Sequence, residues 1–175
     1  MTFGSGAPHD TPEGTGLSRA VLVLAFGADG PDAVQIAVPS IMVREVARVD
    51  RLTAYPGAPS DVPGVAAVRG QIVPVLDLTP GTTEARAVVL LVLGTRAVAL
   101  AGATPVRVAA SEDVSHLSPG ARAHVRLWSG RLLPVAGAVR LHDAARPDAA
   151  GGPVLPLLDA AALIDNVVDD SDGER

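Results

Sequence analysis

The sequence predicts an all-β protein. Valine-rich runs are separated by turn-forming stretches, because the 175 residues include 18 Gly and 15 Pro, which interrupt helices and mark turns. Hydrophobic residues make up 48% of the chain and aromatic residues only 2%, so the core must be built mainly from Val, Leu, Ile and Ala. This length suits one ordinary domain or two small subdomains that share a core.

The first third of the chain predicts a hairpin, followed by a segment in which apolar and polar residues no longer alternate. A strand over residues 18–27 and an alternating strand over 33–38 are separated by a Gly-Pro turn and should pair. Residues 39–49 do not alternate cleanly, because Pro39 can open a short helical turn before the chain becomes extended again. A loop with three prolines follows at 53–64.

Two further pairs of strands are predicted in the middle of the chain. Residues 65–78 fit two strands that meet in a tight turn near Arg69, and residues 87–102 fit a hairpin that turns at Gly94. A loop at 79–86 separates these two pairs.

The last third predicts more extended segments and one helix. Residues 104–114 fit a strand followed by a loop, and residues 123–137 alternate around a turn at Ser129. Residues 153–164 end in helix formers, which predict a short C-terminal helix from about Leu158. The total of at least eight short strands is typical of small barrels or a sandwich.

One apolar phrase occurs three times. Because its copies are almost continuously apolar, both faces of each strand should be covered. In the first copy Pro74 lacks a ladder donor and should lie at an edge or a bulge, Gly70 permits a left-handed turn, and Arg69 should project from a rigid corner. The copies are VRGQIVPVLDL (68–78), SGRLLPVAGA (129–138) and GGPVLPLLDA (151–160).

Charge argues against nucleic acid as a partner. All 14 basic residues are Arg and the net charge is −5, yet residues 17–164 hold 13 Arg against 12 Asp and Glu. The body of the chain is therefore nearly neutral, whereas binding of nucleic acid needs a concentrated basic face. The other acids lie in two segments predicted to be disordered, residues 1–16 and the acidic tail 165–175.

The sequence predicts a soluble, cytoplasmic protein. The absence of Cys excludes disulfides, thiolate catalysis and Cys-ligated zinc. The first sixteen residues lack the basic start and apolar run of a signal peptide. No apolar run approaches the roughly 20 residues that span a membrane.

Signals of catalysis are weak, so we expect no enzyme activity, no metal and no cofactor. The His residues lack metal-ligand spacing, no nucleophile or phosphate-binding motif occurs, and there is no Lys for Schiff-base chemistry. Asp77 and Asp159 occupy equivalent places in two copies of the phrase, which fits capping of a following turn better than paired acid and base. A hydrolase would need a pocket that brings His116 or His124 beside an acid. The four His residues are His9, His116, His124 and His142.

Several segments, taken in order, resemble the CheW-like family of chemotaxis coupling proteins. The resemblance spans residues 19–164 and is strongest over 34–78. There VQIAVPSIMVREVARV and YPGAPSDVPGVAAVRGQIVPVLDL are similar to the family's V.EV stretch, Pro-Gly loop and NLRG phrase. VVLLVLGTRAVAL is similar to the family's next hairpin, and GAVRL with GGPVLPLLDAAALI is similar to its closing strand and helix.

This resemblance implies a fold and a function. The fold is two small five-stranded SH3-like β-barrels that share an apolar seam, within a domain over residues 17–164 whose internal boundary falls near 80–86. The function is that of a non-enzymatic adaptor for chemotaxis. Such adaptors bind the cytoplasmic tips of chemoreceptors and the regulatory domain of a CheA-type histidine kinase, and they link the two in arrays under the membrane.

The resemblance also implies a partner-binding surface. The family's Arg in NLRG corresponds to Arg69, beside Gly70, and a planar guanidinium on a turn can make paired contacts to carboxylate or carbonyl groups. The Glu of the V.EV stretch corresponds to Glu45, flanked by Val43 and Val46. The alternative is that Arg69 is a solvated turn residue and Glu45 a charge on a helix surface.

Departures from the family pattern leave alternatives open. Ala67 replaces the Asn of NLRG, and Ala103 stands where an Asp is common. The third copy of the phrase, within 123–137, is either an extra hairpin or the true closing segment, with 151–164 as an addition. The alternative function is a self-associating β-barrel scaffold whose exposed strand edges build assemblies.

Overall fold

The structure is a computed structural model, and within the residues it describes the prediction of an all-β protein is confirmed. Those residues contain eleven strands, one short 3-10 turn and one α-helix. The predicted disordered tail 1–16 and the loop 79–85 lie outside them. The described ranges are 20–27, 33–56, 62–78, 86–118, 120–127, 129–142 and 152–172.

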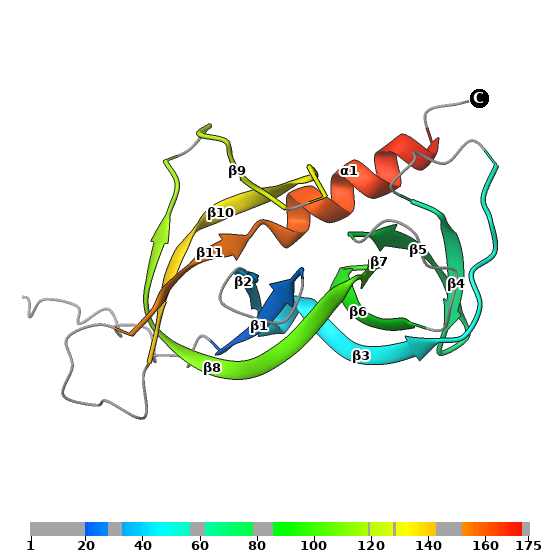
Figure 1. Ribbon diagram of the computed structural model, residues 1–175. Helices are drawn as coiled ribbons and strands as arrows, with labels where there is room; N and C mark the ends of the chain where they lie inside the picture. The colour runs from blue at the N-terminus through cyan, green and yellow to red at the C-terminus, as the bar shows by residue number, and fades with distance from the viewer. Residues whose placement is uncertain are drawn as a thin grey trace, which may run out of the picture.

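The strands form two curled sheets, and α1 (Ala160–Asp172) contacts strands of both (Figure 1). The six-stranded sheet, here the first barrel, has the order β11-β2-β1-β8-β10-β9, and a further pairing of β10 with β11 closes it. Its strands are β1 (Ala20–Phe26), β2 (Val34–Pro39), β8 (Ala103–His116), β9 (Ala123–Arg126), β10 (Leu132–Leu141) and β11 (Val154–Leu158).

The five-stranded sheet, here the second barrel, has the order β3-β6-β7-β5-β4. The 3-10 turn η1 (Ser40–Met42) connects β2 to this second barrel. The loss of alternation in residues 39–49 predicted such a turn. Its strands are β3 (Val43–Val49), β4 (Gly64–Val68), β5 (Gln71–Asp77), β6 (Arg86–Leu93) and β7 (Arg96–Ala101).

The two barrels have the same strand arrangement, which confirms the prediction of two small subdomains. Each contains an antiparallel hairpin, β1-β2 or β6-β7. A closing strand, β11 or β5, runs parallel to the second strand of that hairpin and antiparallel to the strand before it, β10 or β4. Two copies of the apolar phrase therefore fill equivalent places, as β5 and β11.

The third copy of the phrase forms the turn and first half of β10, in an antiparallel hairpin with β9. The true closing strand is β11, so residues 151–164 are not an addition. In the described part of the chain, β9 has no equivalent in the second barrel. It is the strand that brings the first barrel to six rather than the expected five.

The expected internal boundary near 80–86 is not where the sheets separate. β5 and β6 lie on either side of it and belong to the same sheet. The first barrel is instead assembled from β1-β2 and β8–β11, and the second is inserted between them as β3–β7. A copied phrase marks the closing strand of each barrel, but it does not reveal which hairpin that strand closes.

Three cores explain why the strands are apolar on both faces. One lies inside each barrel, and the third, here the apolar seam, lies between the barrels and under α1. In β1, Val21 and Val23 point into the first barrel, whereas Leu22, Leu24 and Phe26 join the seam. The predicted shared seam is thus present, and it covers the outer face of strands whose inner face is already buried.

Pro74 lies neither on an edge strand nor at a bulge, which corrects the expectation. β5 is flanked by β4 and β7, and Pro74 stands opposite Val65. In a hairpin with a two-residue turn, alternate pairs exchange main-chain hydrogen bonds, so the nitrogen of Pro74 faces away from β4. The ladder to β7 begins only at Val75, and no donor is needed at Pro74.

The C-terminal helix is longer than predicted. It begins at Ala160, where Asp159 caps it by accepting a hydrogen bond from the Ala162 nitrogen at 3.0 Å. Residues 165–172, predicted as disordered tail, continue this helix. Val167 is buried against the apolar seam, so the acidic segment still has an apolar side that packs.

β8 also exceeds its prediction. Residues 104–114 were expected to be a strand followed by a loop, but β8 is one strand of 14 residues. It pairs with β1 through its first half and with β10 through its second half. The apolar pattern that marks a strand is weak in the second half of β8, because about half of the residues of β8 face solvent.

A glycine lies where each barrel closes, and this generates a stability prediction. A Cβ at Gly64 would collide with the carbonyl of Thr53, and one at Gly137 with the carbonyl of Ser115. We expect Gly64→Ala and Gly137→Ala each to lower the free energy of unfolding by about 1–3 kcal/mol. Urea denaturation would measure this. Gly94→Asn, in an open hairpin turn at φ +60°, is the control and should change it by less than about 1 kcal/mol; equal losses in all three variants would contradict the close-approach argument.

Candidate partner-binding site

Arg69 and Gly70 form the two-residue turn between β4 and β5. Their φ angles are +50° and +79°, and positive φ at both central residues defines a type I′ turn, which matches the twist of a hairpin. Gly70 suits this geometry, but Arg69 is the only non-Gly residue with positive φ in the described chain. The side chain of Arg69 is 79% exposed, so it projects from a corner whose backbone is fixed.

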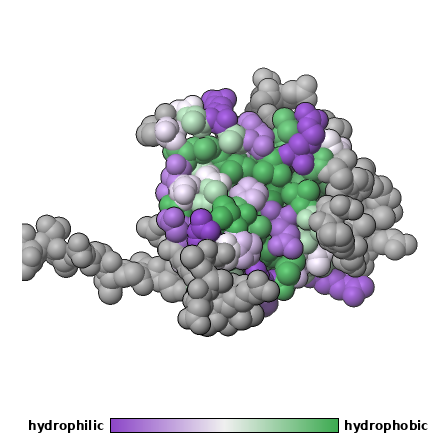
Figure 2. Space-filling model, turned by 60° about the vertical axis from the view of Figure 1, so that its left-hand side comes forward, coloured by the Kyte–Doolittle hydropathy of each residue, from purple (hydrophilic) through white to green (hydrophobic). Residues whose placement is uncertain are grey.

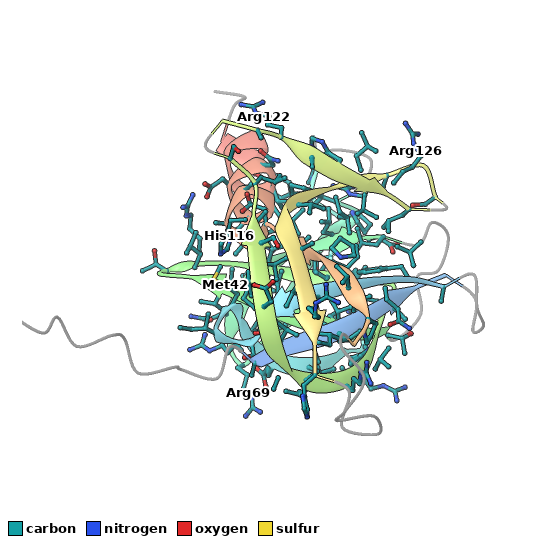
Figure 3. The ribbon with its side chains drawn as sticks, turned by 90° about the vertical axis from the view of Figure 1, so that its left-hand side faces the viewer. Met42, Arg69, His116, Arg122 and Arg126 are labelled. Atoms are coloured by element: carbon teal, nitrogen blue, oxygen red, sulfur yellow. The ribbon has the colours of Figure 1, made fainter. Side chains whose placement is uncertain are left out.

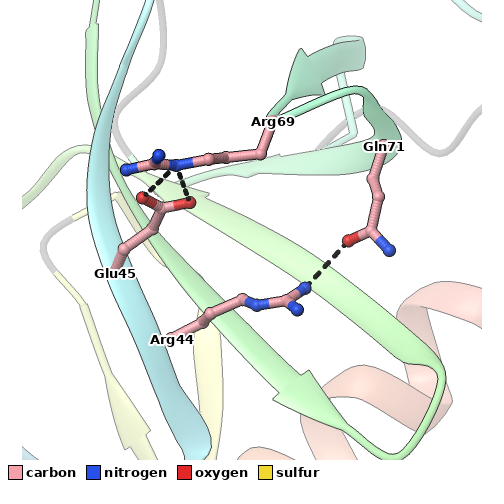
Figure 4. A network of polar contacts seen from close by, with 4 residues as sticks. All are labelled: Arg44, Glu45, Arg69 and Gln71. Atoms are coloured by element: carbon pink, nitrogen blue, oxygen red, sulfur yellow. Dashed lines mark hydrogen bonds and ion pairs between the residues drawn. The ribbon is translucent and has the colours of Figure 1, made fainter.

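The guanidinium of Arg69 is held by Glu45 (Figure 4). Its Nε lies 2.9 Å from Oε2 and 3.2 Å from Oε1 of Glu45, whose side chain is only 19% exposed. Beside this pair, Nη1 of Arg44 donates to Oε1 of Gln71 at 3.0 Å. These four residues, here the Arg69 cluster, line an open hollow of about 380 Å³.

A β-bulge lets neighbouring residues of β3 both reach the hairpin. Val43 pairs with Leu91 and Glu45 with Leu90, so Arg44 is an extra residue in the ladder. In a regular strand Arg44 and Glu45 would point to opposite faces, but a bulge redirects side chains. Both therefore contact the β4-β5 hairpin, through Gln71 and Arg69.

The Arg69 cluster occupies a gap that the first barrel does not have. The first barrel is closed by a ladder between β8 and β10. At the equivalent place in the second barrel, the only main-chain link in the described chain is the bridge between Thr53 and Val65, with two hydrogen bonds of 2.8 Å. Side chains of the Arg69 cluster span the rest of the distance between β3 and the hairpin.

The expected partner-facing residues are not all on this surface. Gly70 is exposed in the turn. Val46 is 48% exposed but lines a separate hollow with Arg48, and Val43 is half-buried and packs against the apolar seam. Sequence reasoning missed Gln71 and Ile72, which is 76% exposed. The sequence carried no clear signal, because the run IVPVL is continuously apolar and does not distinguish the exposed Ile72 from the buried residues that follow it.

A second exposed surface is apolar. Ile41 on η1 is 91% exposed, and Val106 and Val108 on β8 are 49% and 68% exposed. Both η1 and β8 contact β1 and β6, so the two elements that carry these residues neighbour the same strands. The outer face of the first barrel also shows hydrophobic residues gathered between polar ones (Figure 2).

The residues considered for catalysis are not brought together. Asp77 ends β5 and Asp159 directly follows β11, in different barrels, and Asp159 caps α1. Among the described residues no group of three or more His, Asp or Glu could hold a metal ion, and no helix is long and apolar enough to cross a membrane. A groove does hold His124 with Asp159, but that carboxylate is engaged as the cap, and His9 lies outside the described chain.

Comparison with known proteins decides the family. A family model described as CheW-like domain matches residues 23–168. The chain belongs to the CheW-like family. The crystal structure of the scaffolding protein TtCheW from Thermoanaerobacter tengcongensis is similar in fold, with a TM-score of 0.54 and 15% identity over 89% of this chain and 90% of that one. No curated protein matches.

CheW-like domains are non-enzymatic scaffold or adaptor modules of chemotaxis, which confirms the prediction that the chain is not an enzyme. The Arg69 cluster lies inside the residues that the CheW-like family model matches.

The turn itself generates a prediction. Arg69→Asn should leave the free energy of unfolding unchanged or slightly raised, because Asn tolerates positive φ. The exposed ion pair that it removes is worth under about 1 kcal/mol. Arg69→Val should lower it by about 1–2 kcal/mol, because a β-branched residue is strained there. Urea denaturation of both variants tests this; an Asn variant less stable than the Val variant would argue against the type I′ turn.

Proposed function

We propose that this CheW-like protein is an adaptor that couples chemoreceptors to a CheA-type histidine kinase, in the cytoplasm at receptor arrays. The observation that carries the proposal is the guanidinium of Arg69, fixed on a rigid turn by Glu45 and otherwise exposed. The fold of TtCheW, a scaffolding protein, and the family match support the same reading.

The geometry suits recognition of a carboxylate or carbonyl group. Glu45 engages only Nε of Arg69, and the two terminal nitrogens make no hydrogen bond within the described chain. Two parallel N–H groups on a planar guanidinium can bind a partner oxygen pair with fixed geometry. Because the backbone and Nε are already held, little side-chain entropy remains to be lost on binding.

Exposed apolar residues neighbour the cluster in sequence, but they lie on the other faces of their strands. Val46 follows Glu45, and Ile72 follows Gln71, and both are exposed. Ala67, which replaces the Asn of the family phrase, is exposed and pairs with Ile72. Its change therefore alters the face that carries Ile72, whereas the change to Ala103 affects the buried seam.

An adaptor needs a surface for each of its two partners. We assign the Arg69 cluster to the regulatory domain of the kinase, and the apolar strip of Ile41, Val106 and Val108 to the receptor tip. The strip carries exposed apolar side chains of the kind that accept the apolar face of a helix. The assignment is tested by separate variants of the two surfaces.

Self-association remains the second candidate, because β3 has an unpaired edge in the described chain. Apart from the bridge at Thr53, its side facing β4 is closed only by side chains. An open edge with an exposed Val46 is a site where strands of other copies can pair. Sedimentation of the protein alone distinguishes the candidates, since only self-association gives oligomers that grow with concentration.

The binding prediction uses the turn-compatible variant. Arg69→Asn should weaken binding to the CheA regulatory domain at least tenfold, because it removes the guanidinium and keeps the turn. Calorimetry or a pull-down with each CheA-type kinase of the same genome would measure it. Arg51→Asn, an exposed Arg in another loop, is the matched control. Unchanged binding by a folded Arg69→Asn variant would remove the Arg69 cluster from the interface.

Exchange of the two charges separates an internal role from a partner contact. In Glu45→Arg/Arg69→Glu the intramolecular pair is restored with reversed charge. If the guanidinium contacts the kinase, binding should stay at least tenfold weaker than for the unmodified chain. Recovery of full affinity in the double variant would mean that the pair serves only to hold β3 to the hairpin.

A further inference from the structure

The strand β9 leaves one edge of the first barrel open. It pairs only with β10, and within the described residues its other edge makes no main-chain hydrogen bond. The second barrel offers no equivalent of β9, so this edge is not required by the shared strand arrangement. Natural sheets usually protect such an edge, often with charged side chains.

The side chains of this segment are sorted by face. Val125 packs against the apolar seam and Ala123 is half-buried, whereas Arg122, His124 and Arg126 are exposed. Alternate residues of an extended strand are about 7 Å apart on one face. Arg122 and Arg126 stand away from the barrel at the two ends of β9 (Figure 3), with His124 between them in sequence.

Within the described residues no ion pair is formed by this row; the nearest acid is Asp159, which lines the same groove as Arg122 and His124 but caps α1. The residues opposite it on β10 are apolar, since Leu132 pairs with Arg126 and Pro134 with His124. The one hydrogen bond from the row is long, from Nη1 of Arg126 to the carbonyl of Gly130 at 3.5 Å. The row is thus a set of basic groups at regular spacing beside an open strand edge.

We propose that β9 is the docking edge for an extended acidic segment of a partner protein, which adds as a further strand. Its main chain would pair with the open edge of β9, and carboxylates at every second position would face Arg122, His124 and Arg126. Charge complementarity at a two-residue period is what selects this occupant.

A groove at the start of β9 provides room for the end of such a segment. It holds about 360 Å³ between residues 120–124 and the first turns of α1, and Arg122, His124 and Asn166 are among its lining residues. A peptide is favoured over nucleic acid because only a peptide can continue the main-chain ladder. The nearly neutral body of the chain also lacks the broad basic face that nucleic acid needs.

The test uses a fluorescein-labelled peptide with the sequence Thr-Glu-Val-Glu-Val-Glu-Thr and fluorescence anisotropy with the full chain. We expect saturable binding that Arg122→Glu/Arg126→Glu weakens at least tenfold. The control Arg51→Glu/Arg107→Glu changes net charge equally at two exposed positions outside β9 and should stay within twofold. Equal losses in both variants, or no binding by the unmodified chain, would overturn the proposal.

Two further probes test the mode of binding. A peptide methylated at alternate main-chain nitrogens keeps its charges but cannot complete the ladder, and it should bind at least tenfold more weakly. Undiminished binding of that peptide would refute strand addition. A single-stranded oligonucleotide of the same negative charge should bind more weakly than the peptide, and tighter binding would assign the row to nucleic acid instead. None of these outcomes depends on the Arg69 cluster, which lies on the other barrel.

Discussion

The apolar seam between the barrels is the constraint on which the rest of the structure depends. With aromatic residues at 2% of the chain, the barrel interiors are filled mainly by Val and Ala, and each barrel alone is too small to bury much surface. The seam supplies the missing burial. It holds most of the largest fully buried side chains, among them Phe26, Leu76 and Leu91. The strands must therefore be apolar on both faces where the seam and a barrel interior cover them. Exposed positions are left in turns, at strand edges and on the outer faces of β3, β8 and β9, and also at Ile72 of β5.

The two barrels share a strand arrangement but differ in how they close. The first barrel closes through the β8-β10 ladder, whereas the second closes through one bridge and the side chains of the Arg69 cluster. Because the seam and the interior core already stabilise the second barrel, its closure can be left to exposed polar contacts. The same polar groups are then on the surface, where a partner can reach them. Incomplete closure and accessible polar groups are thus two consequences of one strand arrangement.

Local patterns predicted the hairpins well, because turn residues and alternation act over a few neighbours. The Arg69 turn, the 3-10 turn after Pro39 and the hairpin at Gly94 all lie where the sequence placed them. The misses depend on distant contacts. The division into two sheets depends on which hairpin β5 and β11 join. Residues 165–172 are helical because Val167 packs on the apolar seam, and the direction of the Arg44 side chain is set by a β-bulge opposite β6. None of these contacts leaves a signal within a short window of sequence. The family resemblance singled out Arg69 and Glu45 as expected partner-facing residues without revealing that they contact each other.

The presence of Arg at the turn is not explained by stability. A non-Gly residue in the left-handed region costs about 1–2 kcal/mol, and an ion pair with a 79% exposed partner returns less than about 1 kcal/mol. Asn would satisfy the turn better. What the pair does accomplish is orientation: Glu45 fixes Nε, so the plane of the guanidinium is set while its terminal nitrogens remain outside. A locally unfavourable residue that is rigidly held and exposed is the pattern expected when a side chain serves an intermolecular contact. The energetic imbalance at Arg69 therefore favours a partner-binding role over a merely structural one.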